Sequence, residues 1–150
     1  MSRRMELAKA YEKALFAGDR DAVGKLFDDD IMYWVAGAPP IGGEWHGRER
    51  VIDALWNREP GLGPADWEGG DVWRDWYDAE ERVIVEIRER WWLKSHPQDV
   101  MDQRTCVVIR FRGDKIAEMR DHTDTHIYEE FVRRHRAELP KFKQRRDVGA

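Results

Sequence analysis

The spacing of apolar residues changes once along the chain, near Asp71, and this change limits the folds that the sequence can adopt. Before that point apolar residues recur every three or four positions, which is typical of helices that bury one side. After it they alternate with polar residues in four runs, as in strands with one buried face. These runs cover residues 71–78, 82–93, 103–112 and 115–123. Helices followed by strands predict an α+β domain.

Short turns join the later predicted strands. Residues 78–80 and the Gly-Asp pair at 113–114 suit tight connections between antiparallel neighbours. The other predicted elements are helices at 4–17, near 20–27 and from Gly47 to the EPGLGP run at 59–64, a strand at 31–35, and a last helix at 126–139. We therefore expect a curved antiparallel sheet wrapped around three N-terminal helices as a cone-shaped barrel, with a C-terminal helix and a pocket at its open end.

Length, charge and hydropathy exclude several classes of protein. The 150 residues suit one domain with its own core. We assign residues 1–140 to this domain and 141–150 to a basic, flexible tail. A net charge of −4 gives no overall basic field for nucleic acid, and no run has the length and apolarity of a membrane span. The lone Cys106 excludes a disulfide within the chain. We expect a soluble, cytoplasmic protein that needs no cofactor.

Asp121 is the first candidate for a functional residue. Strand alternation over 115–123 places it at the end of a face that begins with Ala117 and Met119 and continues to Thr123. The opposite face is expected to carry Ile116, Glu118, Arg120 and His122. An acid at the end of an otherwise apolar face is either buried and paired or lines a cavity, and both environments shift a carboxyl pKa.

Three segments carry a resemblance to a known family: YEKALFAGDRDAVGKLFDDDIMYW, GEWHGRERVIDAL and FRGDKIAEMRDHTDTHIYEEF. Their order and spacing resemble the nuclear transport factor two superfamily, in its SnoaL-like group of ketosteroid isomerases, polyketide cyclases and limonene epoxide hydrolases. The resemblance implies the cone-shaped fold, a cofactor-independent site for a small hydrophobic molecule, and a homodimer formed through the convex face of the sheet.

Within this group, the motifs of the chain most resemble those of limonene epoxide hydrolase. By that resemblance Asp121, within RDHTD, takes the place of the catalytic aspartate of the last strand, Tyr33 that of a water-holding tyrosine, and Arg88 that of an arginine beside the acids. Two positions differ, because Arg90 stands where that family has its second carboxylate and Val35 stands where it has an asparagine. Epoxide opening needs one group to activate water and another to protonate the leaving oxygen, so the second role has no residue here.

The comparison with ketosteroid isomerase gives a different result. Tyr11 falls on the tyrosine that stabilises the oxyanion in that family. Val35 falls on its base, and Val107 lies near its protonated acid. Valine cannot transfer a proton, so the chain lacks the residues with which that family usually isomerises steroids.

The resemblance places Arg88 in the cavity, and alternation then brings Glu86, Arg90 and Trp92 to the same face. On this hypothesis Asp121 is either the general base or the acid that positions a water molecule, Arg88 orients it, Tyr33 assists, and Glu86 supplies the missing acid. The other residues expected to line the pocket are Tyr11, Val35, Val107, Met119, Thr123 and Tyr128. The alternative is that Val83, Val85 and Ile87 face the core, which leaves the charged residues as a structural ion-pair network or on the solvated face.

A metal site is a rival interpretation of the HTDTH run. His122, Asp124 and His126 alternate along an extended chain and could together hold a metal ion. Asp124 or Thr125 is also a natural N-cap for the last predicted helix, and capping turns His126 away from His122.

Two functions remain open from the sequence. One is an enzyme that uses acid–base chemistry on a hydrophobic, cyclic molecule, as an isomerase, cyclase, dehydratase or hydrolase. The other is a non-catalytic ligand carrier or structural subunit of the same fold, which the two substituted catalytic positions favour.

Overall fold

A computed structural model describes residues 1–39, 41–57 and 67–137 of the protein. The elements follow one another as α1 (Arg3–Phe16), α2 (Arg20–Leu26), β1 (Phe27–Val35), β2 (Gly43–His46), α3 (Arg48–Asn57), β3 (Trp67–Ala79), β4 (Arg82–Leu93), β5 (Met101–Arg112), β6 (Lys115–Thr123) and α4 (Thr125–Arg134). The predicted α+β class is confirmed. The expected tail at 141–150 and the EPGLGP run at 59–64 lie outside the described residues.

The strands form one curved, six-stranded sheet in the order β2-β1-β6-β5-β4-β3. The pairs β3–β4, β4–β5 and β5–β6 are antiparallel, as predicted for strands joined by short turns. The pairing of β1 with β6 is parallel, so the sheet is mixed and not purely antiparallel as expected. This parallel contact brings Val35 opposite Asp121, although 86 positions separate them in the chain.

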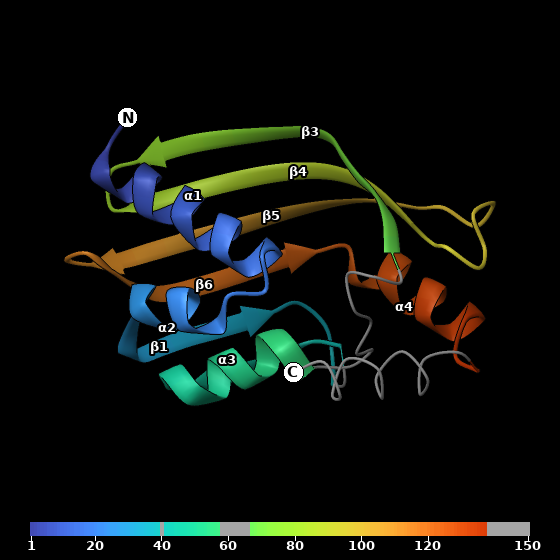
Figure 1. Ribbon diagram of the computed structural model, residues 1–150, viewed down its shortest axis with the longest axis horizontal. Coiled ribbons are helices and arrows are strands. Elements are labelled where there is room, and N and C mark those ends of the chain that lie inside the picture. Colours follow the sequence, from blue (N-terminus) through green and yellow to red (C-terminus); the bar gives the residue numbers. More distant parts are fainter. Residues whose placement is uncertain (40, 58–66, 138–150) are drawn as a thin grey trace.

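Helices α1, α2 and α3 lie on one face of the sheet (Figure 1). We call this the inner face and the opposite one the outer face. The main core packs between these helices and the inner face and includes Phe27, Ile31, Val83 and Ile116, all with no exposed surface. A second, smaller core joins Leu93, Met101 and Phe131 where α4 meets one end of the sheet.

Polar N-caps set the starts of three helices. Ser2, Asp19 and Asp124 accept hydrogen bonds from the backbone N–H groups of Met5, Ala22 and Ile127. Each bond satisfies a donor that has no partner inside the first helical turn. None of the helices in the described ranges is both long and apolar enough to cross a membrane.

A register shift near the start of β6 corrects the predicted faces of that strand. Arg110 pairs with Glu118, but the next residue, Phe111, pairs with Ile116, so Ala117 is an extra residue on β6. A bulge of this kind reverses the alternation on one side of it. Ile116 therefore shares the inner face with Met119, and the expectation that it lies beside Glu118 is wrong.

Candidate functional site

Asp121 lies on the inner face within a row of apolar side chains. The strand register places Val35 opposite it on β1 and Val107 opposite it on β5, and Val85 follows Val107 on β4. Val35 and Val85 are buried, whereas Asp121 keeps part of its surface exposed. Asp121 is thus an acidic residue within an otherwise apolar row of the inner face.

Thr105 fixes the orientation of the Asp121 carboxylate. Its hydroxyl Oγ1 donates to Oδ1 of Asp121 over 2.8 Å. Thr105 sits opposite Thr123 in the β5–β6 pairing, and Val107 opposite Asp121, so this hydrogen bond runs diagonally between the two strands. The hydrogen bond therefore fixes the direction in which the carboxylate of Asp121 points.

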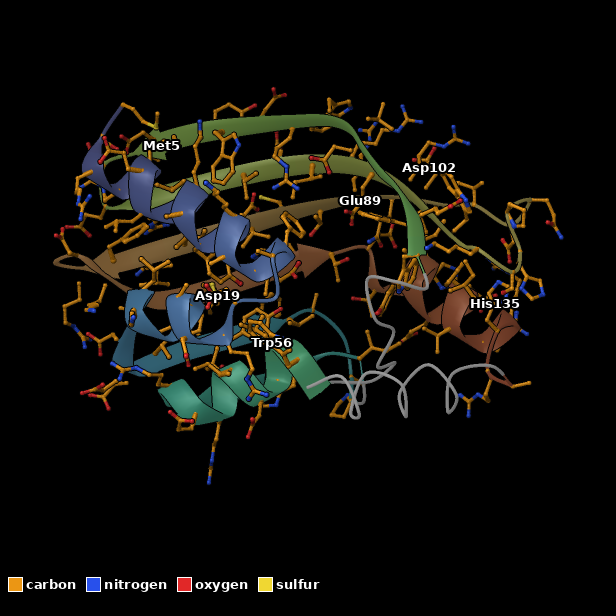
Figure 2. All side chains as sticks on the ribbon, in the orientation of Figure 1. Met5, Asp19, Trp56, Glu89, Asp102 and His135 are labelled. Atoms are coloured by element: carbon orange, nitrogen blue, oxygen red, sulfur yellow. The ribbon has the colours of Figure 1, made fainter. Side chains whose placement is uncertain are left out.

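A second carboxylate, Glu89, occupies the inner face two strands away. Gln103 Nε2 donates to its Oε1 over 2.7 Å and the indole Nε1 of Trp91 donates to its Oε2 over 2.8 Å. Gln103 is buried at 7% exposure and stands directly opposite Glu89 in the β4–β5 pairing. Two donors from rigid neighbours hold Glu89 in one geometry, and Figure 2 labels it on β4.

An ion-pair group lies beside Glu89. Arg74 of β3 pairs with Glu12 of α1, and its Nε donates to Oδ2 of Asp71 over 2.6 Å. Asp71 is in turn the cross-strand partner of Glu89. Burial raises the pKa of Glu12, although the Arg74 guanidinium opposes that shift, and the nearby charges of Asp71 and Glu89 add to the rise. This end of the inner face therefore favours positive charge or protonated acids.

The outer face carries the four β4 residues that the sequence hypothesis placed in the cavity, namely Glu86, Arg88, Arg90 and Trp92. Arg88 makes a two-bond ion pair with Asp102 of β5, at 3.1 Å through Nε and 2.9 Å through Nη2. The pairing lowers the Asp102 pKa.

The remaining contacts of these residues also lie on the outer face. Glu86 accepts a hydrogen bond from the hydroxyl of Tyr77 over 3.3 Å, and the indole of Trp92 donates to Glu68. Arg90 lies within 3.6 Å of Asp102. The expected contact of Arg88 and Glu86 with Asp121 is wrong, and the alternative of charges on the solvated face describes their placement.

The burial of β4 explains this reversal. Val83 and Val85 have no exposed surface and Ile87 has 5%, so these three residues take the inner face. Glu89 and Trp91 continue the same alternation. Glu89 and Trp91 were not predicted to face inward, because the prediction for this strand started from the position of Arg88. Continuing the alternation of Val83, Val85 and Ile87 by two residues would have found Glu89.

Several other predicted lining residues do lie on the inner side. Tyr33 and Met119 are buried and stand opposite each other across β1 and β6. The Tyr33 ring stacks on Trp45, with ring centres 5.6 Å apart. Tyr11 of α1 contacts Phe27 in the main core. The structure thus brings Tyr33, Val35, Val107, Met119, Asp121 and Thr123 to one face, with Tyr11 in the helix layer above it.

Tyr128 is on α4, at the end of the sheet. It packs against the smaller core of Leu93, Met101 and Phe131. Its helix lies beside the beginning of β3, as Figure 1 shows. Tyr128 therefore belongs to the Trp91 and Glu89 end of the inner face rather than to the row that contains Asp121.

The HTDTH run forms a strand end and a helix cap. His122 lies on the outer face with its ring centre 4.9 Å from that of Trp34, while Asp124 caps α4. The capping interpretation is confirmed. Within 1–39, 41–57 and 67–137, no three His, Cys, Asp or Glu side chains are grouped as metal ligands.

Comparison with known proteins defines the family. The sequence model described as a SnoaL-like domain matches residues 7–119. Among solved structures, a nuclear transport factor two-like protein from Burkholderia xenovorans LB400 is 18% identical, with 86% of this chain and 95% of that chain covered and a TM-score of 0.71. The search of curated proteins gave no match.

Two further structures were solved with small molecules. TerC, co-crystallised with polyporic acid, is 16% identical over 88% of this chain and 99% of that one, with a TM-score of 0.71. A protein from Catenulispora acidiphila DSM 44928 with a ketosteroid isomerase-like fold, in complex with trimethylamine, is 22% identical over 78% and 84%, with a TM-score of 0.57. At these identities the likeness concerns the fold alone.

Proposed function

The chain belongs to the SnoaL-like domain family, and from this premise we propose that it is an enzyme that moves a proton on a small, hydrophobic, cyclic molecule bound against the inner face. The observation that carries the proposal is the position of Asp121 between Val35 and Val107, with Thr105 holding its carboxylate. Relatives of the same fold were crystallised with polyporic acid and with trimethylamine, which supports a small molecule as the ligand.

A single mobile proton fits this site better than hydrolysis does. Asp121 takes a proton from a carbon next to a carbonyl group of the ligand, the electron pair moves to the carbonyl oxygen as an enolate, and Asp121 returns the proton at another carbon. This isomerisation needs one reacting carboxylate. In a cyclisation the enolate carbon instead attacks a second carbonyl group of the ligand, and Asp121 returns the proton to the oxygen of that carbonyl, so one carboxylate is again sufficient. Hydrolysis needs a separate acid for the leaving group, and Glu86, the residue expected to supply it, is on the outer face.

The tyrosines Tyr33 and Tyr11 are proposed to bind the ligand oxygen. Tyr33 lies on the same face of β1 as Val35, two residues earlier, and Tyr11 enters from α1. A phenolic hydroxyl donates a hydrogen bond to an oxygen that gains negative charge, and such donors lower the barrier in sites that exclude water. Met119 and Val107 supply the apolar wall.

Filling the inner face tests the binding step. Val107→Trp places a large side chain beside Asp121, so we expect at least a 10-fold loss in affinity for polyporic acid as a probe, measured by equilibrium dialysis. Val72→Trp is the matched control, because Val72 is 48% exposed at a bulge in β3. Native mass spectrometry of freshly purified protein should show a co-purified molecule that only Val107→Trp excludes. Equal binding by both variants contradicts a ligand site on the inner face.

We further propose that the outer face pairs two copies of the chain. Tyr77 is 46% exposed there, and Trp73 and Trp92 lie among paired charges, which is the composition of many protein interfaces. Sedimentation equilibrium at micromolar concentration should give the mass of a dimer, and Tyr77→Asp should shift it toward the monomer. A monomeric wild type refutes this pairing.

A further inference from the structure

A polar cleft lies beside the C-terminal end of α4. It has a volume of about 480 Å³ and is lined by His96, Gln98, Asp99, Arg134, His135 and Ala137. The turn between β4 and β5 forms one side and the last turn of α4 the other. Figure 2 labels His135 at this end of α4, well away from Asp19 and Trp56.

Asp99 joins the two sides of the cleft. Its carboxylate accepts two hydrogen bonds from Arg134, through Nε and Nη2, each over 2.9 Å. The same carboxylate lies 2.7 Å from Nε2 of His135, whose residue is only 5% exposed. The Arg134 hydrogen bonds lower the Asp99 pKa, so this group is ionised and can only accept. His135 therefore carries a proton on Nε2, and this N–H donates a hydrogen bond to Oδ2 of Asp99.

A continuous series of ring contacts connects His135 to the inner face. The His135 and Phe131 ring centres are 4.6 Å apart, and Phe131 stacks on Trp67 at 5.3 Å. Trp67 meets Trp91 edge to face at 6.4 Å, and the Trp91 indole donates to Glu89. The same series of contacts joins Phe131 to the donor that holds Glu89.

Helix α4 depends on contacts of this kind for its position. It has ten residues, and isolated helices of this length are marginal in water. Its N-terminal end is tied to β1 by the Thr125 hydroxyl, which donates to the Ala36 carbonyl over 2.8 Å. The contacts of Asp99 with Arg134 and His135 tie its C-terminal end.

We propose that Asp99 and His135 are positioning residues for the inner-face site: they hold α4 so that Phe131 and Trp67 fix the Trp91 indole on Glu89, and protonation of His135 tightens this arrangement. The link to ligand binding rests on the proposed function, because it assumes that Glu89 belongs to the ligand site. The link from His135 to Trp91 does not depend on it.

The charges around His135 determine the sign of the effect. Asp99 and His96 face it from the turn, with the His96 ring centre 4.9 Å away, and Arg134, Arg133 and Glu130 are its charged neighbours on α4. Imidazoles usually change charge between about pH 5 and 8. Protonation of His135 adds a positive charge to a donor whose acceptor, Asp99, is already ionised, so the bond gains the attraction between two opposite charges. The arrangement is therefore tighter at pH 5.5 than at pH 8.

Nuclear magnetic resonance of the Trp91 indole N–H tests the proposal without any ligand. The resonance is assigned with Trp91→Phe and followed from pH 5.5 to 8. Because Glu12, whose pKa is raised, also lies near Glu89, the effect of His135 is the part of the wild-type shift that His135→Gln removes. We expect the shift with pH to fall to less than half of the wild-type value in both His135→Gln and Asp99→Asn.

His46→Gln is the matched control, because His46 forms an exposed pair with Glu44 over 2.9 Å on β2, far from α4 in the sheet. It should keep the full shift. A Trp91 resonance that does not move with pH, or that moves equally in wild type and His135→Gln, overturns the proposal. If Asp99→Asn does not fold, His135→Gln decides the outcome. The ligand-binding result for Val107→Trp is separate, so either idea can fail alone.

Discussion

Asp121→Asn is expected to reduce proton transfer by about 10²–10⁴-fold, the usual contribution of a general base. The asparagine amide has nearly the same shape as the carboxylate but cannot accept a proton at neutral pH. A suitable measurement is deuterium incorporation into a set of cyclic ketones incubated with the protein in heavy water, read by mass spectrometry. The assay detects abstraction of a proton next to a carbonyl even before the natural substrate is known.

Two matched variants separate the role of Asp121 from its surroundings. Thr105→Val removes the hydroxyl that donates to Asp121 and should reduce exchange by about 10-fold or more, because the carboxylate loses the contact that orients it toward the ligand. Glu86→Gln makes the same carboxylate-to-amide change on the outer face and should leave exchange unchanged. If Asp121→Asn retains wild-type exchange while its circular dichroism spectrum is intact, Asp121 is not the base.

Local patterns in the sequence were sufficient to predict most of the helices and strands. The predicted strands at 82–93 and 115–123 have the bounds of β4 and β6, since strong alternation and the turn at 113–114 act over a few residues. The helix at 4–17 corresponds to α1. β2 was missed because four residues, Gly43–His46, are too few to establish a period. The last helix ends at Arg134, with His135 as its C-cap, rather than at Leu139.

Pairing between distant segments could not be predicted in the same way. The parallel contact of β1 with β6 joins residues that no local pattern connects, yet it places Val35 beside Asp121. The bulge at Ala117 arises from the fit between β5 and β6 and has no turn residue to mark it. Local alternation still placed Asp121 on the correct face, because Asp121 follows Met119 after the bulge.

The placement of the candidate residues on the two faces of the sheet was predicted in part for a related reason. Family resemblance located Asp121, Tyr33, Val35 and Val107, which lie on one face in the structure. The same resemblance failed for Arg88, because this chain fills the inner face of β4 with Val83, Val85 and Ile87. Burial of three branched apolar side chains outweighs any benefit from placing paired charges inside, since charges lose their hydration on burial. On β4 itself the charged residue that does face inward, Glu89, comes only where this apolar series ends.

Phe131→Ala is expected to destabilise α4 by about 3–5 kcal/mol, the usual cost of removing a buried phenylalanine from a core. Phe131 has no exposed surface and stacks on Trp67 at 5.3 Å, so truncation leaves a cavity between α4 and the sheet. Glu129→Ala, at an exposed position on the same helix, should change stability by no more than about 0.5 kcal/mol. Urea unfolding followed by tryptophan fluorescence measures both variants.

Amide hydrogen exchange then shows how far that loss extends. Phe131 belongs to the smaller core with Leu93 and Met101, whereas β1 and the first parts of β4 and β6 belong to the main core under α1 to α3. Cores that are separate in this way can open independently. We therefore expect faster exchange in α4 and in the β3 residues near Trp67, with protection in β1 and β6 retained. Uniform loss of protection contradicts this division, because it requires α4 and the inner-face row around Asp121 to unfold as one unit.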